Sequence, residues 1–208
     1  MGNSARVALS LLCLCVVAGV RATDEGGDNV AAASAIASED VEALRSAQES
    51  ATECTTRRSL CIFDFDHTLK LGSRYDCCGY MPDQSLETVR ACQSNGFDIA
   101  VASANTHWDF VRSFLKDNYP QIAGMVYTEA VQTGQSYKTT SLSAVLRHYQ
   151  MEETPECAVF FDDLWSNKKY ADATSIPFEK VDPQRGVSMA NVQSGLAKAR
   201  ENCRCGLN

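Results

Sequence analysis

The chain lacks any run of basic residues, and Arg57-Arg58 and Lys168-Lys169 are only pairs. Its 26 acidic residues outnumber its 19 lysines and arginines, so the formal net charge is −7. Nucleic acids and anionic membrane surfaces are themselves negatively charged and do not attract an acidic protein. We therefore expect neither nucleic acid nor a membrane as a partner of the mature chain.

The sequence also lacks an apolar run of the ~20 residues that a membrane-spanning helix needs. Its longest apolar stretch, VALSLLCLCVVAGV at residues 7–20, follows the basic residue Arg6. Val20 and Ala22 then fit the small-residue pattern that precedes a cleavage site. We interpret residues 1–22 as a signal peptide rather than an anchor. The protein would then enter the secretory pathway and be secreted or stay in an endomembrane compartment.

The spacing typical of zinc sites is missing too, because no Cys-x2-Cys pair occurs among the ten cysteines. The cysteines that follow the predicted signal are Cys54, Cys61, Cys77, Cys78, Cys92, Cys157, Cys203 and Cys205. Their even number favours disulfides in an exported protein. Cys61 and Cys157 lie in predicted core strands, so they are alternatively plain buried thiols. The sequence does not assign the pairing.

A length of 208 residues suits one domain of ordinary size. Residues 23–37 are rich in glycine, alanine and acidic residues without an apolar period, and we predict a flexible leader there. The domain would span residues 38–208. It would begin with a helix at 38–53, where the apolar stripe is weak.

From Ser59 onward, short apolar runs alternate with helical patterns. The runs predict buried strands at residues 59–64, 97–103, 124–128, 157–161 and 176–181. The helical patterns lie at residues 84–95, 107–118, 139–150, 165–173 and 188–201. This alternation predicts an α/β fold, with a central parallel sheet between two layers of helices.

Polar side chains stand at the predicted strand ends and at one helix start, where parallel α/β sheets bind ligands. They are Asp64, Asp66, Ser103, Lys138, Asp162 and Asp163. Several carboxylates in one crevice repel each other unless a cation lies among them. Oxygen ligands suit Mg²⁺, so the pattern predicts a Mg²⁺ site at this edge of the sheet.

These residue types are suited to phosphoryl transfer. With Mg²⁺ bound, Asp64 would stay ionised and attack phosphorus as a covalent nucleophile. Asp66 would protonate the leaving oxygen and later activate water. Lys138 and the Ser103 hydroxyl would hold the phosphoryl oxygens, where negative charge is concentrated.

The stretch DFDHTL, Asp64 to Leu69, resembles the DxDx[TV] signature of the haloacid dehalogenase superfamily. Ser103, Lys138 and Asp162-Asp163 resemble its second, third and fourth motifs, in the same order, within residues 59–201. The resemblance implies a three-layer Rossmann-like fold. It also implies a Mg²⁺-dependent phosphomonoester hydrolase that works through a phospho-aspartyl intermediate on Asp64.

The resemblance also implies roles for single residues. The Mg²⁺ ligands would be Asp64, Asp66 through its backbone carbonyl, Asp162, and Asp163 directly or through water. The phosphate-binding residues would be Ser103, Lys138 and Thr68. Thr68 would also help to orient the loop that carries the nucleophile.

A closer resemblance is to the magnesium-dependent phosphatase branch, which has FFDD and an Asn four residues later, as at Phe160–Asp163 and Asn167. That branch carries Arg after its second-motif Ser, where this chain has Ala104-Asn105. It usually has an aromatic residue at the position of His67. Asn105 and His67 are therefore candidate substrate contacts. Alternatively, His67 hydrogen-bonds a backbone carbonyl.

No cap domain is expected, because helix and strand patterns account for most of the chain between the motifs. An uncovered crevice admits a large substrate, or needs a partner that closes it and excludes water. The sequence does not say whether the phosphorylated substrate is a phosphoprotein, a sugar phosphate or a nucleotide, and the oligomeric state stays open. Two alternatives remain: a catalytically silent module that binds a phosphorylated ligand, and a phosphotransferase with an acceptor other than water.

Overall fold

The parts of the chain that the computed structural model describes are residues 58–72, 79–134 and 137–203. The predicted signal peptide (1–22), leader (23–37) and helix (38–53) lie outside them and stay predictions. No helix within the described residues is long and apolar enough to cross a membrane.

Five parallel strands form one sheet in the order β3-β2-β1-β4-β5. Their bounds are β1 Ser59–Phe63, β2 Phe97–Ala102, β3 Val131–Gln132, β4 Ala158–Asp162 and β5 Phe178–Lys180. Phe63 of β1 lies beside Val101 of β2 and Phe161 of β4. The strand order reverses between β1 and β4, and α/β sheets bind ligands at such a switch point.

Helices cover both faces of the sheet. They are α2 Ser85–Ser94, α3 Trp108–Asn118, α4 Pro120–Ala123, α5 Lys138–Tyr149, α6 Lys168–Ala173 and α7 Met189–Asn202, with two 3-10 turns, η1 Pro155–Cys157 and η2 Trp165–Asn167. All five predicted helices are present, although the one predicted at 165–173 divides into η2 and α6.

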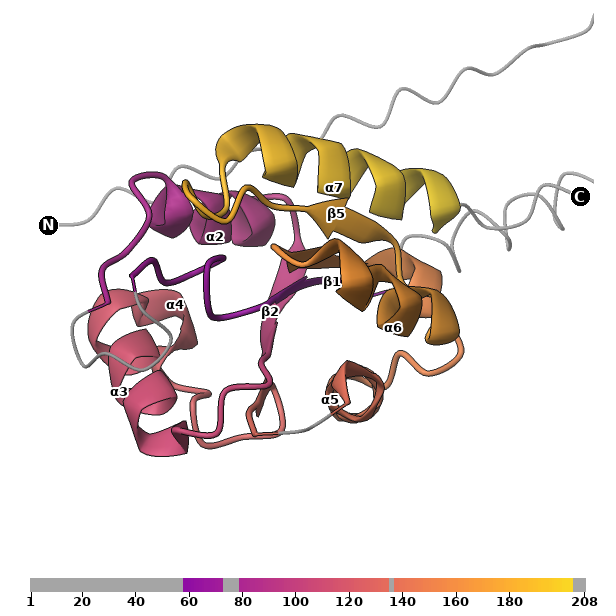
Figure 1. The fold of residues 1–208 in the computed structure, drawn as a ribbon. Helices are drawn as coiled ribbons and strands as arrows, with labels where there is room; N and C mark the ends of the chain where they lie inside the picture. Colours follow the sequence, from indigo (N-terminus) through magenta and orange to yellow (C-terminus); the bar gives the residue numbers. More distant parts are fainter. Residues whose placement is uncertain (1–57, 73–78, 135–136, 204–208) are drawn as a thin grey trace, which may run out of the picture. The chain divides into compact units, whose positions relative to one another are not determined.

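Alternate residues of each strand enter opposite cores, as the geometry of a strand requires. In β1, Cys61 and Phe63 enter one core, whereas Leu60 and Ile62 enter the other. Helices α2, α3, α4 and α7 contribute to the first core, and α5 and α6 contribute to the second (Figure 1). The predicted three-layer α/β architecture is confirmed.

The third strand lies later in the chain than the sequence predicts. The apolar run at 124–128 forms turns, in which Val126 is buried and the Thr128 hydroxyl donates to the Met125 carbonyl (2.8 Å). The strand itself is β3, which pairs with β2. The predicted strand at 124–128 is wrong because a short apolar run fits a buried turn as well as a strand.

Two cysteine pairs lie at disulfide distance. Cys61 of β1 pairs with Cys92 of α2, and Cys157 of η1 pairs with Cys203 after α7. The Cα–Cα distances are 6.4 and 4.5 Å. Cys61 and Cys157 are therefore not the plain thiols that the sequence left open. Such pairs persist in oxidising compartments, which agrees with passage through the secretory pathway.

Replacing Cys61 and Cys92 together by alanine should lower the free energy of unfolding. The pair joins residues 31 positions apart, and opening that loop should cost about 3–4 kcal/mol by releasing the unfolded chain. Chemical denaturation of the oxidised protein measures the loss. The matched control replaces Cys157 and Cys203, which are 46 positions apart and should give a similar loss. Two double variants as stable as the oxidised wild type would show that these cysteines are unpaired.

Candidate active site

Three buried carboxylates gather where β1 and β4 end. Asp64 directly follows β1, and its backbone amide donates a hydrogen bond to the Phe161 carbonyl of β4 (2.8 Å). Asp162 ends β4, and Asp163 follows it. One carboxylate oxygen from each aspartate lies within 4.8 Å of the other two. Pairing of adjacent parallel strands thus brings together the first and fourth motifs of the sequence.

Lys138, the first residue of α5, supplies positive charge to this cluster. Its Nζ donates to Asp64 Oδ1, to Asp162 Oδ2 (2.9 Å) and to the Ala102 carbonyl (3.0 Å). The dipole of a helix disfavours a cation at this end. Three carboxylates and one ammonium carry a net charge of −2 when all are ionised. A divalent cation would balance that charge.

Burial shapes the ionisation of the cluster. It raises the pKa of Asp64 from 3.8 to about 8, against the opposing effect of the Lys138 ammonium. Burial, followed by the charge of Asp162, also raises the pKa of Asp163. Burial alone would lower the pKa of Lys138, but the charges of Asp64 and Asp162 outweigh it and raise that pKa. The cluster therefore favours the uptake of a proton or a cation.

Asp66 is held in a different way. Asn105 Nδ2 donates to its Oδ2 (2.8 Å), and Lys70 Nζ donates to its Oδ1 (3.2 Å). The His107 backbone amide in turn donates to Asn105 Oδ1 (2.8 Å). Asn105, which the sequence suggests as a substrate contact, thus contacts the second aspartate of the signature. Its predicted contact with substrate stays a prediction.

Lys70 is a member of the site that no sequence motif identifies. Its side chain is fully buried, and its Nζ lies 5.7 Å from the centroid of the Phe65 ring. A turn brings it back to Asp66, because the backbone amides of Leu69 and Lys70 both donate to the Phe65 carbonyl (3.0 and 2.9 Å). The only sequence feature that relates Lys70 to Asp66 is their spacing of four residues. Pairs of aspartate and lysine at this spacing are common on exposed helices, so the spacing does not identify a site.

His67 lies in this same turn with a left-handed backbone (φ 59°), which is uncommon for residues other than glycine. Its backbone amide donates to the Lys70 carbonyl (2.7 Å), and its Nδ1 lies 3.3 Å from the Pro183 carbonyl. The contact with a backbone carbonyl is therefore present. A contact of His67 with substrate stays a prediction.

Thr68 is fully buried, and its hydroxyl has no hydrogen-bond partner among the described residues. Its carbonyl accepts a hydrogen bond from the Val187 amide (3.0 Å), which joins the nucleophile loop to the segment before α7. The predicted role of Thr68 in orienting the loop stays a prediction. Binding of phosphate by Thr68 stays a prediction, because its side chain does not line the cavity described next.

A cavity of about 100 Å³ lies among the site residues. It is lined by Asp64, Asp66, Ser103, Ala104, Lys138, Leu164, Asn167 and Tyr170. The structure thus brings the predicted nucleophile, acid/base and phosphate-binding lysine and serine to one cavity. Asn167 Nδ2 donates to both carboxylate oxygens of Asp162 (3.0 and 2.9 Å), which holds that side chain in the cluster.

Removing the Asp64 carboxylate should flatten the pH dependence of stability in the absence of divalent cations. Between 3.8 and about 8, the folded chain keeps a proton on Asp64 that the unfolded chain loses. The free energy of unfolding of the wild type should therefore fall as the pH rises through this range, by on the order of a few kcal/mol. The Asp64→Asn variant should lose most of this fall.

Denaturation in the presence of a chelator, at several pH values across that range, measures the effect. The Asp83→Asn variant is the matched control, because Asp83 is an exposed carboxyl outside the cluster, and it should keep the wild-type slope. A wild type whose stability stays constant or rises over this range would contradict the raised pKa of Asp64.

Comparison with known proteins gives matches to solved structures. No family model and no curated protein sequence matches the chain. The phosphatase domain in the N-terminal part of a Bacteroides fragilis protein, solved with Mg, matches with a TM-score of 0.50 and 16% identity, over 69% of this chain and 41% of that one. A haloacid dehalogenase-like hydrolase from Streptococcus pneumoniae matches with a TM-score of 0.44 and 10% identity, over 66% of this chain and 90% of that one.

At such low identity, the likeness to the Bacteroides fragilis domain is a likeness of fold, and the chain spans less than half of that protein's length. It agrees with the central parallel sheet and with the helices on both of its faces. The described part of the chain therefore has a three-layer α/β fold similar to that of this phosphatase domain, as its strand and helix patterns predict.

Proposed function

We propose that the protein is a Mg²⁺-dependent phosphomonoester hydrolase with Asp64 as its nucleophile. The observation that carries this proposal is the cluster of three buried carboxylates around Lys138, at the switch point of the sheet. The phosphatase domain from Bacteroides fragilis, whose crystal structure contains Mg, supports it through its similar fold.

The donor set of the cluster fits Mg²⁺. Asp64, Asp162 and Asp163 each offer one carboxylate oxygen, and Mg²⁺ prefers oxygen ligands while it keeps several waters. We add the backbone carbonyl of Asp66 to this set, as the sequence resemblance implies. When bound, the ion would offset the negative charge of the cluster and of the phosphoryl oxygens.

In the first step, an Asp64 carboxylate oxygen attacks phosphorus while the bond from phosphorus to the leaving oxygen breaks. The backbone of Asp64 is fixed to β4, so its carboxylate stays aimed into the cavity. To bind a phosphoryl oxygen, Lys138 releases one of the three hydrogen bonds that its Nζ donates. Ser103 also donates, since its Oγ accepts the Asn105 backbone amide (3.1 Å) and keeps its own hydrogen for the substrate.

Asp66 moves the protons of both steps. It gives a proton to the leaving oxygen while phospho-Asp64 forms. It then takes a proton from the water that cleaves this intermediate, so that inorganic phosphate leaves and both aspartates return to their starting states. Asn105 and Lys70 each contact one oxygen of Asp66, and these contacts keep the carboxyl group directed at the cavity.

The site should accept large substrates. Between β1 and β2 the described residues contain only α2 and loops, and between β2 and α5 they contain only α3, α4, β3 and loops. None of these elements has the size of a cap domain. A phosphoprotein or a sugar phosphate is therefore the substrate that we propose.

The wild-type protein with Mg²⁺ should release phosphate from an aryl phosphate such as 4-nitrophenyl phosphate. The Asp64→Asn variant should lower kcat by about a thousandfold or more, because an amide does not attack phosphorus. A colorimetric assay at saturating Mg²⁺ measures the rate, and Asp83→Asn serves as the control that should keep wild-type activity. Equal rates for wild type and Asp64→Asn would overturn the proposed mechanism.

Mg²⁺ should also raise the Tm of the wild type, since an ion that binds only the folded state stabilises it. In Asp162→Asn, the Mg²⁺ concentration needed for half of this shift should rise about tenfold or more. Thermal unfolding without substrate measures the shift independently of activity. The exposed control Asp83→Asn should respond as the wild type does, whereas an unchanged response of Asp162→Asn would exclude this aspartate as a ligand.

A further inference from the structure

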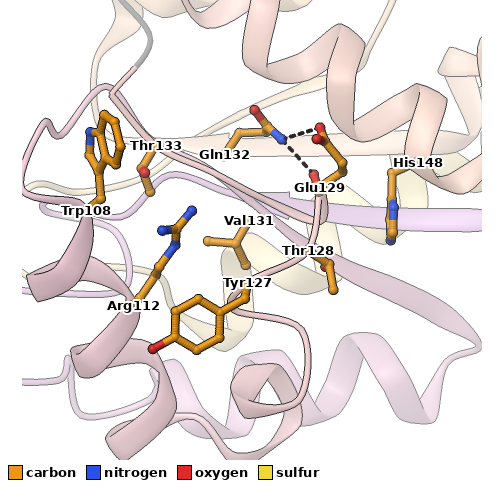
Figure 2. Close-up of a pocket in the computed structure, with 9 residues that line it drawn as sticks. All are labelled: Trp108, Arg112, Tyr127, Thr128, Glu129, Val131, Gln132, Thr133 and His148. Atoms are coloured by element: carbon orange, nitrogen blue, oxygen red, sulfur yellow. Dashed lines mark hydrogen bonds between the residues drawn. The ribbon is translucent and has the colours of Figure 1, made fainter.

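A second and larger cavity lies along the edge of the sheet beside β3. We call it the β3 groove, and its volume is about 520 Å³, against about 100 Å³ for the catalytic cavity (Figure 2). Its walls come from α3, the turn before β3, β3 itself and the end of α5. The lining residues that matter here are Trp108, Arg112, Tyr127, Glu129, Gln132 and His148. None of them lines the catalytic cavity.

Arg112 is a donor without a matching acceptor in this groove. Its guanidinium carbon lies 5.5 Å from the centroid of the Tyr127 ring. Its Nε is buried and has no hydrogen-bond partner among the described residues. A buried donor costs stability until an acceptor is supplied. A carboxylate is the strongest acceptor for a guanidinium, because the hydrogen bonds are charge-assisted and paired.

The groove has one positive and one negative side. Figure 2 shows Arg112 between Trp108 and Tyr127, and it shows Glu129 and His148 across the groove. The Gln132 side chain holds Glu129 there, donating to its Oε2 (2.8 Å) and to its carbonyl (3.0 Å). An anionic group would therefore bind on the Arg112 side.

The two aromatic residues beside Arg112 are exposed. Trp108 has 55% and Tyr127 has 75% of its surface open to solvent. Aromatic residues and arginine are enriched at the centres of protein interfaces, where large flat side chains give contact area. The side of the groove that attracts an anion therefore also provides apolar surface for a neighbouring side chain.

The floor of the groove is a sheet edge. Within the described part of the chain, β3 pairs with β2 alone and ends the sheet. Extended peptides bind such edges by adding a strand. A small metabolite is usually buried over most of its surface when bound. Trp108 and Tyr127, on the walls of the groove, are largely exposed, so a peptide fits this open groove better than a metabolite does.

The groove adjoins the catalytic cavity at the end of β3. The Ser103 amide, in the catalytic cavity, donates to the carbonyl of Gln132, which lines the groove (2.8 Å). The Trp108 indole packs over Gly134, where a Cβ would lie 2.5 Å from Nε1. Arg112 follows Trp108 by four residues, which is about one turn, or ~6 Å, along α3. A chain in the groove therefore runs toward the site of phosphoryl transfer.

We propose that the β3 groove docks an extended peptide, and that the substrate is a phosphorylated peptide segment with an acidic side chain that pairs with Arg112. This inference rests on the proposed function, because it names the substrate of the same site. The net charge of −7 does not attract acidic peptides in general, so the preference depends on Arg112 itself. Glu129 repels a second carboxylate, which favours one acidic residue over an acidic run.

Matched phosphopeptides test the proposal. All peptides carry the same phosphorylated residue. In each set of three, one neighbouring position holds Glu, Ala or Lys, and successive sets place that position at increasing distance from the phosphorylated residue. At the best position, wild-type kcat/KM should be about tenfold higher for Glu than for Ala. The Arg112→Ala variant should lose this difference, and Arg112→Glu should prefer Lys. Arg200→Ala removes a positive charge from α7, where Arg200 contacts Asn95, and should keep the wild-type preference.

Hydrolysis of the aryl phosphate is the internal control. It should stay at the wild-type rate in the Arg112 variants, because a small aryl group does not need the groove. A reversed preference in Arg112→Glu also does not arise from misfolding. A wild type that hydrolyses the aryl phosphate but treats the Glu, Ala and Lys peptides equally would overturn the docking proposal and leave the proposed function intact.

A binding measurement tests the docking groove independently of the proposed phosphatase activity. The chain has two tryptophans, so Trp165→Phe leaves Trp108 as the only one. The fluorescence of Trp108 should change when the unphosphorylated Glu peptide binds, and Arg112→Ala should weaken this binding about tenfold. Such binding without turnover of any phosphomonoester would sustain the docking groove and overturn the phosphatase. No binding, or equal binding of the Glu and Lys peptides, would overturn the groove.

Discussion

The contact of Lys138 with Asp64 and Asp162 is the interaction on which the site depends. β1 and β4 are neighbouring strands, and a buried carboxylate directly follows β1 and ends β4, so the sheet brings two like charges together. Without the ammonium between them, those charges would repel each other and oppose folding. The same contact explains why α5 begins with a lysine, although the helix dipole disfavours a cation there.

The remaining negative charge links stability to function. The lysine offsets only part of the charge of the three carboxylates, so the folded protein takes up a proton on Asp64 where an exposed aspartate would be ionised. A divalent cation would relieve the same charge while leaving the carboxylate free to attack phosphorus. The arrangement is therefore costly for folding by itself, and under the proposed function it would be useful in the presence of a metal and a phosphate group, a trade-off that is common at active sites.

The sequence predicts the fold and most of the site because both depend on local signals. Buried strands appear as apolar runs, and the acids that follow two of them meet once these strands are parallel neighbours. The third strand was misplaced, because the buried turn at 124–128 has the same apolar pattern as a strand. Lys70 could not be predicted, since it reaches Asp66 through a left-handed turn at His67, where the sequence has no glycine to signal it. The contact of Asn105 with Asp66 depends on how two distant loops meet.

The small volume of the catalytic cavity implies that specificity comes from outside it. In the proposed mechanism, the residues that line it would contact the phosphoryl group and the attacking and departing oxygens, which all phosphomonoesters share. Interactions with remote parts of a substrate must then distinguish one phosphomonoester from another. Such interactions also lower the activation barrier of the reaction if they position the reacting group. The β3 groove is the surface that adjoins the cavity through Ser103 and Gln132. In the proposed docking mode, Arg112 would select an acidic peptide from outside the cavity, whereas Lys138 would act on the phosphoryl group that all such substrates share.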